Sequence, residues 1–327
     1  MQLRRWQHEA VKAALTKYET EHPHFLCLAT PGAGKTFMAS RIAKELMDSG
    51  KIDLVFCFSP SVNVATSFQA SIESQLKCKL DGLLGSKGRS LTYQSMPSQD
   101  LSFWSLLSQY KTLAIFDEIH HCAGDNLDNA NVWGQKIIQH IQGEADYTLA
   151  LSGTPWRSDK VPIALSSYCV DGVIQCDYTY GLERAIQDGV CRIPKIIAVD
   201  NDEITLLSGD ERERYSSFAE LLKQSKCTYQ QLLDSSDLIT YMIKITAKKI
   251  NEVRKRQPNS GALVVAATVD HAIKIAEIIK RDTGDSARVV TYLHDGAQDT
   301  IRDFREANDK WIVSVGMISE GTDIPRL

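Results

Sequence analysis

The sequence lacks several features that would assign it to common classes of protein. None of its eight cysteines forms a C-x-x-C pair, and no apolar stretch approaches the ~20 residues of a membrane span. Positive charge is not in excess either, since the formal net charge is −4. These absences favour reduced thiols over a metal site and predict a cytoplasmic protein with no membrane contact. Any positive surface for nucleic acid must then be local to a groove.

The sequence does contain short apolar runs that alternate with helical patterns. Its 327 residues are enough for two domains of about 150 residues each. Each run has the length of a strand and is continuously apolar, which fits strands buried on both faces of a parallel sheet. The runs are Phe25–Ala29, Leu54–Phe58, Leu113–Phe116, Tyr147–Leu151, Ala262–Ala267, Val289–Leu293 and Trp311–Val315.

The runs form two groups, and a polar segment with a helical pattern, Ser208–Arg256, lies between them. We therefore predict an α/β protein with two domains, residues 1–191 and 192–327, and a helical segment within the second range. Asp81–Ser90 has the composition of a surface loop. The apolar stripe of the helical segment consists of Leu221, Leu222, Leu238, Met242, Ile243 and Ile250.

The most specific motif is Ala29-Thr-Pro-Gly-Ala-Gly-Lys-Thr36, between a predicted strand and a helix predicted over Phe37–Asp48. Its glycines let backbone N–H groups surround phosphate oxygens, and the helix N-terminus adds partial positive charge. We expect Lys35 to reach the β- and γ-phosphates of ATP and Thr36 to bind Mg²⁺. The rest of the predicted phosphate loop is Pro31, Gly32, Ala33 and Gly34, although the general pattern begins with Gly where this chain has Ala29.

A second motif, Asp117-Glu-Ile-His120, follows an apolar run, and open α/β sheets place their ligand sites at such strand ends. We expect Asp117 to hold Mg²⁺ and Glu118 to orient and deprotonate the attacking water. His120 is expected to link this segment to neighbouring motifs by hydrogen bonds. His121 and Cys122 lack a second pair of metal-ligating residues, which favours a structural role for them.

Further strings lie in a fixed order around these two motifs. A polar string follows several of the predicted strands, and an amphipathic segment precedes the phosphate loop. They are Leu3–Ala10 (LRRWQHEA), Ser59–Asn63 (SPSVN), Thr92–Met96 (TYQSM), Leu151–Arg157 (LSGTPWR), Ala262–Ala272 (ALVVAATVDHA) and Trp311–Pro325 (WIVSVGMISEGTDIP).

In this ordered set of motifs the sequence resembles superfamily 2 helicases of the DEAD/DEAH-box kind. It is most similar to the branch that contains excision-repair helicases and restriction-enzyme motor subunits. The resemblance implies two RecA-like domains of the P-loop NTPase fold, with ATP and Mg²⁺ as cofactors. It also implies an ATP-dependent helicase or translocase that acts on nucleic acid at an inter-domain cleft, with DNA favoured over RNA.

The resemblance also assigns roles to single residues. Gln7 would recognise adenine, because its amide can pair with adenine N6 and N7, and Arg4 would support it. Ser152 and Thr154 would couple ATP hydrolysis to strand movement. Gly321 and Asp323 would lie near ribose and the γ-phosphate, and the residues expected to contact nucleic acid without reading its sequence are Pro60, Ser61, Thr92, Gln94 and Ser319.

The chain departs from the family pattern at its end. The family's sixth motif supplies arginine fingers, which are worth ~10³–10⁵ in rate, and it should follow about 25 residues after Pro325. Here the sequence stops at Leu327. We therefore expect an incomplete second domain, slow hydrolysis and weak unwinding, with a protein partner that completes the domain or supplies a nuclease.

Two other functions account for part of the sequence. A non-catalytic, ATP-gated nucleic-acid-binding module, or a subunit of a restriction or defence complex, would fit the missing arginine motif. The intact Lys35, Asp117 and Glu118 favour catalysis instead. A metabolic P-loop kinase would leave Ser152–Pro155 and Glu320–Pro325 without explanation.

Overall fold

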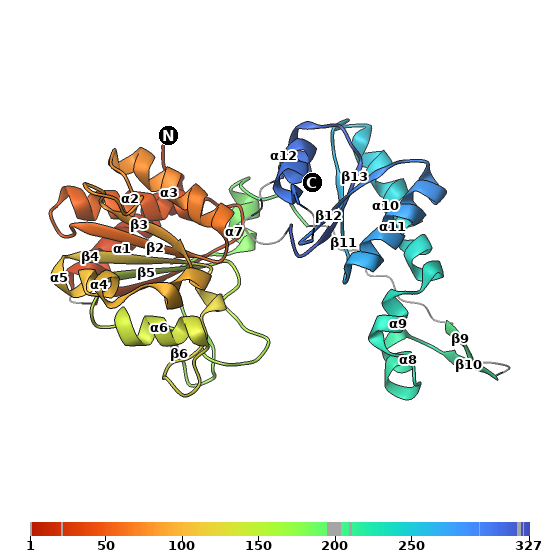
Figure 1. The fold of residues 1–327 in the computed structure, drawn as a ribbon, viewed down its shortest axis with the longest axis horizontal. Coiled ribbons are helices and arrows are strands. Elements are labelled where there is room, and N and C mark those ends of the chain that lie inside the picture. The colour runs from red at the N-terminus through yellow and green to blue at the C-terminus, as the bar shows by residue number, and fades with distance from the viewer. Residues whose placement is uncertain are drawn as a thin grey trace. The chain divides into compact units, whose positions relative to one another are not determined.

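The computed structural model describes residues 2–20, 22–194, 204–208, 211–293, 295–318, 322 and 324–327. The chain divides into two compact units, Met1–Pro194 and Lys195–Leu327, each with its own sheet (Figure 1).

The first unit is built on a six-stranded sheet with all neighbouring strands parallel, in the order β3-β2-β4-β5-β1-β8. Four of the predicted apolar runs form its central strands, and β4 is buried at every position. The α/β prediction with a parallel sheet is confirmed. The strands are β1 (His24–Ala29), β2 (Leu54–Ser59), β3 (Gly88–Thr92), β4 (Thr112–Asp117), β5 (Tyr147–Ser152) and β8 (Tyr178–Tyr180).

Helices cover both faces of this sheet, which is why its strands are apolar on both sides (Figure 1). Alternate residues of one strand enter different cores: Cys27 packs under α1 (Arg5–Glu19), α2 (Lys35–Asp48) and α3 (Val62–Leu76). Leu26 packs on the other face with α4 (Leu101–Trp104), α5 (Leu106–Gln109) and α6 (Val132–His140). The helix predicted over Phe37–Asp48 begins two residues earlier, at Lys35.

Two edge strands and several short elements are not evident from the sequence. β3 begins inside Asp81–Ser90, the segment predicted to be a loop. The sequence does not reveal this strand, because only two of its five residues are buried. Gly88 is required there, since a Cβ atom would lie 1.8 Å from the carbonyl oxygen of Val55. The remaining short elements are η1 (Tyr93–Ser98), η2 (Ile119–His121), β6 (Ser167–Tyr168), β7 (Ile174–Gln175) and α7 (Leu182–Gln187).

The second unit has a parallel three-stranded sheet in the order β11-β13-β12. Its apolar residues form two clusters, one beneath α10 (Ser236–Arg254) and α11 (Val269–Thr283), the other beneath α12 (Ala297–Glu306). The strands are β11 (Ala262–Val265), β12 (Ala287–Thr291) and β13 (Trp311–Val315).

Three sequence predictions for this unit are wrong in detail. The segment predicted as helical begins with an antiparallel hairpin, β9 (Ile204–Ser208) and β10 (Glu211–Tyr215), before α8 (Phe218–Gln224), α9 (Tyr229–Leu233) and α10. Met242 is 50% exposed, because the buried stripe of α10 runs through Ile239 and Ile243 at the helical spacing. The run predicted over Val289–Leu293 leaves the sheet after Thr291, so Tyr292 and Leu293 are exposed.

Two kinds of feature have no candidate among the described residues. Within the ranges given above, no helix combines the length and hydropathy that crossing a bilayer requires. In the same ranges, no group of three His, Cys, Asp or Glu side chains is arranged to hold a metal ion.

Candidate active site

Three adjacent strands bring the predicted ATP motifs together. β4, β5 and β1 lie side by side and parallel, so their carboxyl ends meet at one edge of the sheet. Asp117–His120 follows β4, Ser152–Thr154 ends β5, and the phosphate loop follows β1. Strings that are more than 30 residues apart in the sequence thereby become neighbours.

The phosphate loop has the backbone geometry that its glycines predict. Gly32 and Gly34 have φ values of 76° and 96°, in the left-handed region that favours glycine. A Cβ atom at position 34 would also lie 2.8 Å from Nε2 of Gln7. Thr36 lies in the first turn of α2, which begins at the buried Lys35. Pro31 and Gly32 are exposed, whereas Ala33 is buried against the core.

The Glu118 carboxylate is held by groups from three strings. Its Oε1 forms an ion pair with Nζ of Lys35, and the two side chains are only 13% and 9% exposed. Its Oε2 accepts a hydrogen bond of 3.1 Å from the backbone N–H of Gly153. The same oxygen lies 3.5 Å from Nδ1 of His120. Glu118 itself has φ 51°, which turns the chain sharply at the end of β4.

His120 and Ser152 connect the carboxylate segment to the end of β5. Nδ1 of His120 and Oγ of Ser152 are 3.0 Å apart, within hydrogen-bond distance. Ser152 Oγ also accepts a bond of 3.1 Å from the backbone N–H of Thr154. Arg157 donates from its guanidinium to the carbonyl oxygen of His120 at 2.6 Å. Of the two predicted coupling residues, Ser152 thus contacts the segment through its side chain.

Asp117 ends β4 with 7% of its surface exposed. Its backbone carbonyl accepts a hydrogen bond of 2.8 Å from the hydroxyl of Tyr93. The Asp117 carboxylate and the Thr36 hydroxyl are oxygen donors of the kind that Mg²⁺ prefers. Together with the glycine geometry of the loop and the buried Lys35, this donor set fits a magnesium–nucleotide ligand.

The two residues predicted to recognise adenine are bonded to the phosphate loop. Gln7 donates from Nε2 to the carbonyl oxygen of Gly34 at 2.9 Å, and its Oε1 accepts from the backbone N–H of Arg4 at 2.8 Å. The Arg4 guanidinium donates to the carbonyl oxygen of Ala33 at 2.6 Å. In this structure both residues therefore support the loop, and their role toward adenine stays a prediction.

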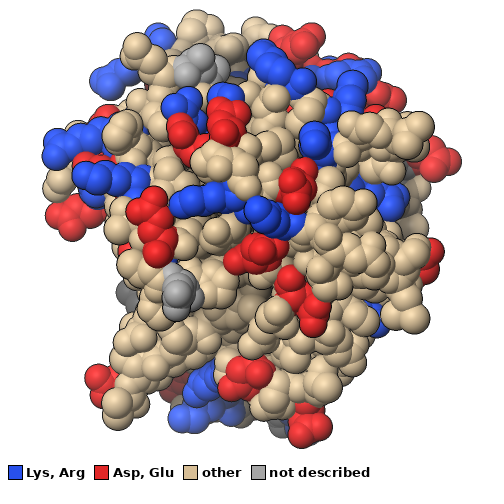
Figure 2. All heavy atoms as spheres, turned by 90° about the vertical axis from the view of Figure 1, so that its left-hand side faces the viewer, with Lys and Arg blue, Asp and Glu red and all other residues tan. Residues whose placement is uncertain are grey.

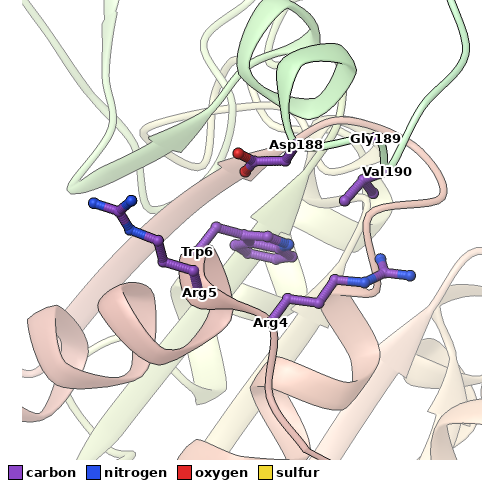
Figure 3. Close-up of a pocket in the computed structure, with 6 residues that line it drawn as sticks. All are labelled: Arg4, Arg5, Trp6, Asp188, Gly189 and Val190. Carbon is purple, nitrogen blue, oxygen red and sulfur yellow. The ribbon is translucent and has the colours of Figure 1, made fainter.

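A cavity of about 450 Å³ lies next to this support. Figure 3 shows Arg4 and Arg5 extending to opposite sides with the Trp6 indole between them. Trp6 stacks on Tyr180, with ring centroids 4.7 Å apart and an interplanar angle of 13°. The opposite wall of the cavity consists of Asp188, Gly189 and Val190, which follow α7.

The predicted nucleic-acid residues of the first unit also come together. β2 and β3 are adjacent, and Ser59 lies opposite Thr92, so Pro60 and Gln94 follow the same sheet edge. Gln94 donates from Nε2 to the carbonyl oxygen of Pro60 at 3.0 Å. The exposed Ser61 caps α3. These residues lie on the other side of β4 from the phosphate loop, whereas Ser319, Gly321 and Asp323 lie outside the described residues.

Charge on the molecular surface is mixed. Figure 2 shows lysine and arginine side chains interspersed with aspartate and glutamate over the face in view. Among the described residues on that face, no broad area carries a single sign of charge.

Three cysteines of the first unit, Cys27, Cys57 and Cys122, are buried core residues. Burial raises the pKa of the Cys27 thiol to about 12, and it raises the pKa of Cys57 and Cys122 still further. A buried thiol that stays protonated is neither a nucleophile nor a metal ligand.

Sequence reasoning did not assign three residues of this site. Gly153 packs so closely that a Cβ atom would lie 2.9 Å from Cδ of Pro31. Arg157 and Tyr93 hold backbone carbonyls of the Asp117–His120 segment. All three lie inside sequence motifs that neighbouring residues make recognisable. Their contacts were not predictable, because they depend on strand order.

Comparison with known proteins relates the chain to restriction enzymes. Residues 1–157 match a family model described as "Type III restriction enzyme, res subunit". An uncharacterized protein of Mycobacterium tuberculosis (strain ATCC 25618 / H37Rv) is 31% identical over 341 residues, covering 99% of this chain and 55% of that protein. The chain thus spans about half the length of this relative.

Two solved structures are similar in fold. The fragment structure of a putative HsdR subunit of a type I restriction enzyme from Vibrio vulnificus YJ016 has a TM-score of 0.61 at 15% identity, covering 99% of this chain and 56% of that one. S. cerevisiae Dbp5 bound to RNA and ADP BeF3 has a TM-score of 0.51 at 13% identity, covering 99% and 72%. These likenesses support the P-loop NTPase fold.

Proposed function

We propose that this chain, a superfamily 2 helicase-like protein related to the restriction-motor branch, hydrolyses ATP in a nucleic-acid-dependent reaction. DNA is the favoured nucleic acid, because residues 1–157 match a restriction-enzyme model. The Dbp5 neighbour carries RNA, so both nucleic acids belong in any test. Translocation on duplex and strand separation are both compatible with this proposal.

The observation that carries the proposal is the position of the Glu118 carboxylate between Lys35, the Gly153 amide and His120. A carboxylate at this place can orient a water molecule and accept its proton. In the proposed reaction Lys35 leaves Glu118 for the phosphates, which frees the carboxylate for the water. A single ion pair would then prevent the base from acting before nucleotide is bound.

The remaining roles follow from the chemistry of each group. The backbone N–H groups of Gly32–Gly34, which follow Pro31, would surround the phosphates. Thr36 and Asp117 would hold Mg²⁺, which neutralises phosphate charge when bound. Ser152 and Thr154 would relay changes at His120 to the end of β5. We propose that Gly321 and Asp323 also act toward the ribose and the γ-phosphate of the nucleotide.

Nucleic acid would bind along the β2–β3 part of the sheet edge. Ser61 offers a hydroxyl and the N-terminus of α3, both suited to phosphate oxygens. Thr92 and Gln94 offer a hydroxyl and an amide beside it, and Ser319 would contact the strand from the second domain. Contacts of this kind hold a strand without reading its sequence, as a motor requires.

Two substitutions on the same helix test the assignment of the nucleotide site. Lys35→Ala should abolish binding of Mg·ATP and its hydrolysis, because the buried ammonium is lost. Lys44→Ala is the matched control, since Lys44 lies on the same helix and pairs with the exposed Asp48. If Lys35→Ala binds nucleotide as tightly as Lys44→Ala, the proposed site is wrong.

A further inference from the structure

Tyr93 lies in the middle of a segment whose neighbours face the surface. Thr92 is half-buried and Gln94 is exposed, and both are proposed to contact nucleic acid. The Tyr93 side chain, in contrast, has 0% exposure and turns into the core on the α6 face of the sheet. Thr92 and Gln94 thus lie at the proposed nucleic-acid-binding edge, and the residue between them lies in the interior.

The buried side chain is fixed by two contacts. Its ring stacks on Trp133, with centroids 5.7 Å apart and an interplanar angle of 23°. Its hydroxyl donates to the carbonyl oxygen of Asp117 at 2.8 Å. Burial raises the pKa of Tyr93 well above its usual value, so the hydroxyl remains a donor at all physiological pH values.

The Tyr93 hydroxyl is thereby bonded to the residue that precedes Glu118. Cys122, which ends the turn that contains His120, lies in the same buried cluster as Tyr93. If the backbone at Thr92–Gln94 shifts, the Tyr93 ring and its hydroxyl move together, because the phenol is rigid. The carbonyl of Asp117 then shifts relative to the phosphate loop, since a close-packed interior transmits displacement.

We infer that Tyr93 is a positioning residue that couples nucleic acid at the β2–β3 edge to the Asp117–Glu118 pair. The inference rests on the proposed function and deepens it by naming the side chain that carries the stimulation. Tyr93 itself contacts neither nucleic acid nor nucleotide in this scheme.

The test compares two conservative substitutions that remove the same kind of hydrogen bond. Tyr93→Phe deletes only the hydroxyl that reaches Asp117. Tyr18→Phe is the matched control, because the buried Tyr18 donates to the carbonyl oxygen of Thr148 at 2.9 Å. Thr148 lies near the start of β5, so it is at the amino ends of the parallel strands, whereas the site is at their carboxyl ends. Both variants should therefore lose similar thermal stability.

The measured quantities are the ratio of ATPase rates with and without saturating DNA, and the affinity for DNA. We expect Tyr93→Phe to lower the ratio about fivefold, the effect of one neutral hydrogen bond, with DNA affinity within about twofold of the parent. Tyr18→Phe should keep the parent's ratio. A role in stability alone would affect both variants equally.

Three results would overturn the inference: Tyr93→Phe keeps the parent's ratio, Tyr18→Phe loses it to the same extent, or Tyr93→Phe loses DNA affinity in proportion to its rate. If the parent chain shows no stimulation by DNA or RNA, the proposed function itself fails, and the inference fails with it. The two failures are distinguished by the parent's behaviour.

Discussion

Replacing Glu118 by glutamine alters the ion pair at the centre of the site while leaving its shape unchanged. Glutamine keeps an oxygen that can accept from the Gly153 amide, but it carries no charge to hold the Lys35 ammonium. In the native chain a phosphate must compete with this carboxylate for the same ammonium group. We therefore expect Glu118→Gln to bind Mg·ATP more tightly than the parent and to hydrolyse it far more slowly.

The size of each effect follows from the burial of the pair. With side chains 9% and 13% exposed, the pair is neither a surface contact worth about 0–1 kcal/mol nor a fully buried one. Desolvation offsets most of its Coulomb attraction, which leaves a net contribution of about 1.4 kcal/mol. Removing it should tighten nucleotide binding about tenfold. Loss of a general base should lower the hydrolysis rate by about 10²–10⁴.

Titration with a fluorescent ATP analogue and single-turnover hydrolysis measure the two effects separately. Glu45→Gln is the control, because Glu45 pairs with Arg41 on the exposed side of α2. The assignment of the general base is refuted if Glu118→Gln hydrolyses ATP as fast as the parent. Weaker nucleotide binding by this variant would instead refute the competition between carboxylate and phosphate for Lys35.

Three further predictions concern packing, pH and the metal. Gly153→Ala should weaken Mg·ATP binding about tenfold in the same titration, because its Cβ would lie 2.9 Å from Cδ of Pro31, whereas Gly181→Ala, in open space, should not. Burial lowers the pKa of His24 to about 4, so the unfolded chain binds the extra proton and the free energy of unfolding should rise from pH 4 to pH 6.5. Urea unfolding across that range should show a flatter rise for His24→Gln. EDTA should abolish ATP hydrolysis, and Asp117→Asn should raise the Mg²⁺ concentration needed for the half-maximal rate. Hydrolysis that persists in EDTA would contradict the proposed role of Thr36 and Asp117.

The strands that are buried on both faces of the sheet were largely predictable from the sequence. β2, β4 and β5 are apolar on both faces, so their sequences alone identify strands of a parallel sheet. β3 was missed because Gly88 and its polar neighbours pair with only one strand, β2, at the edge of the sheet. Met242 was misplaced because a regular apolar spacing does not say which of two adjacent stripes faces the core.

The candidate site was predictable as a set of strings but not as a set of contacts. Most of these motifs follow a strand that the sequence indicates; the exceptions are Leu3–Ala10, which precedes β1, and Thr92–Met96, which follows the missed β3. The bonds from Gly153 to Glu118 and from Tyr93 to Asp117 depend on which strands are neighbours, and local sequence does not encode strand order. The bond from Gln7 to Gly34 joins α1 to the phosphate loop, and local sequence does not show it either; the role of Gln7 toward adenine stays a prediction.

The rate of ATP hydrolysis by the purified chain in Mg²⁺, alone and with duplex DNA, single-stranded DNA or RNA of equal length, tests the central claim most directly. We predict a slow basal rate that DNA raises at least about tenfold, more than RNA does, and that Lys35→Ala abolishes. A rate that is the same with and without every nucleic acid would contradict it.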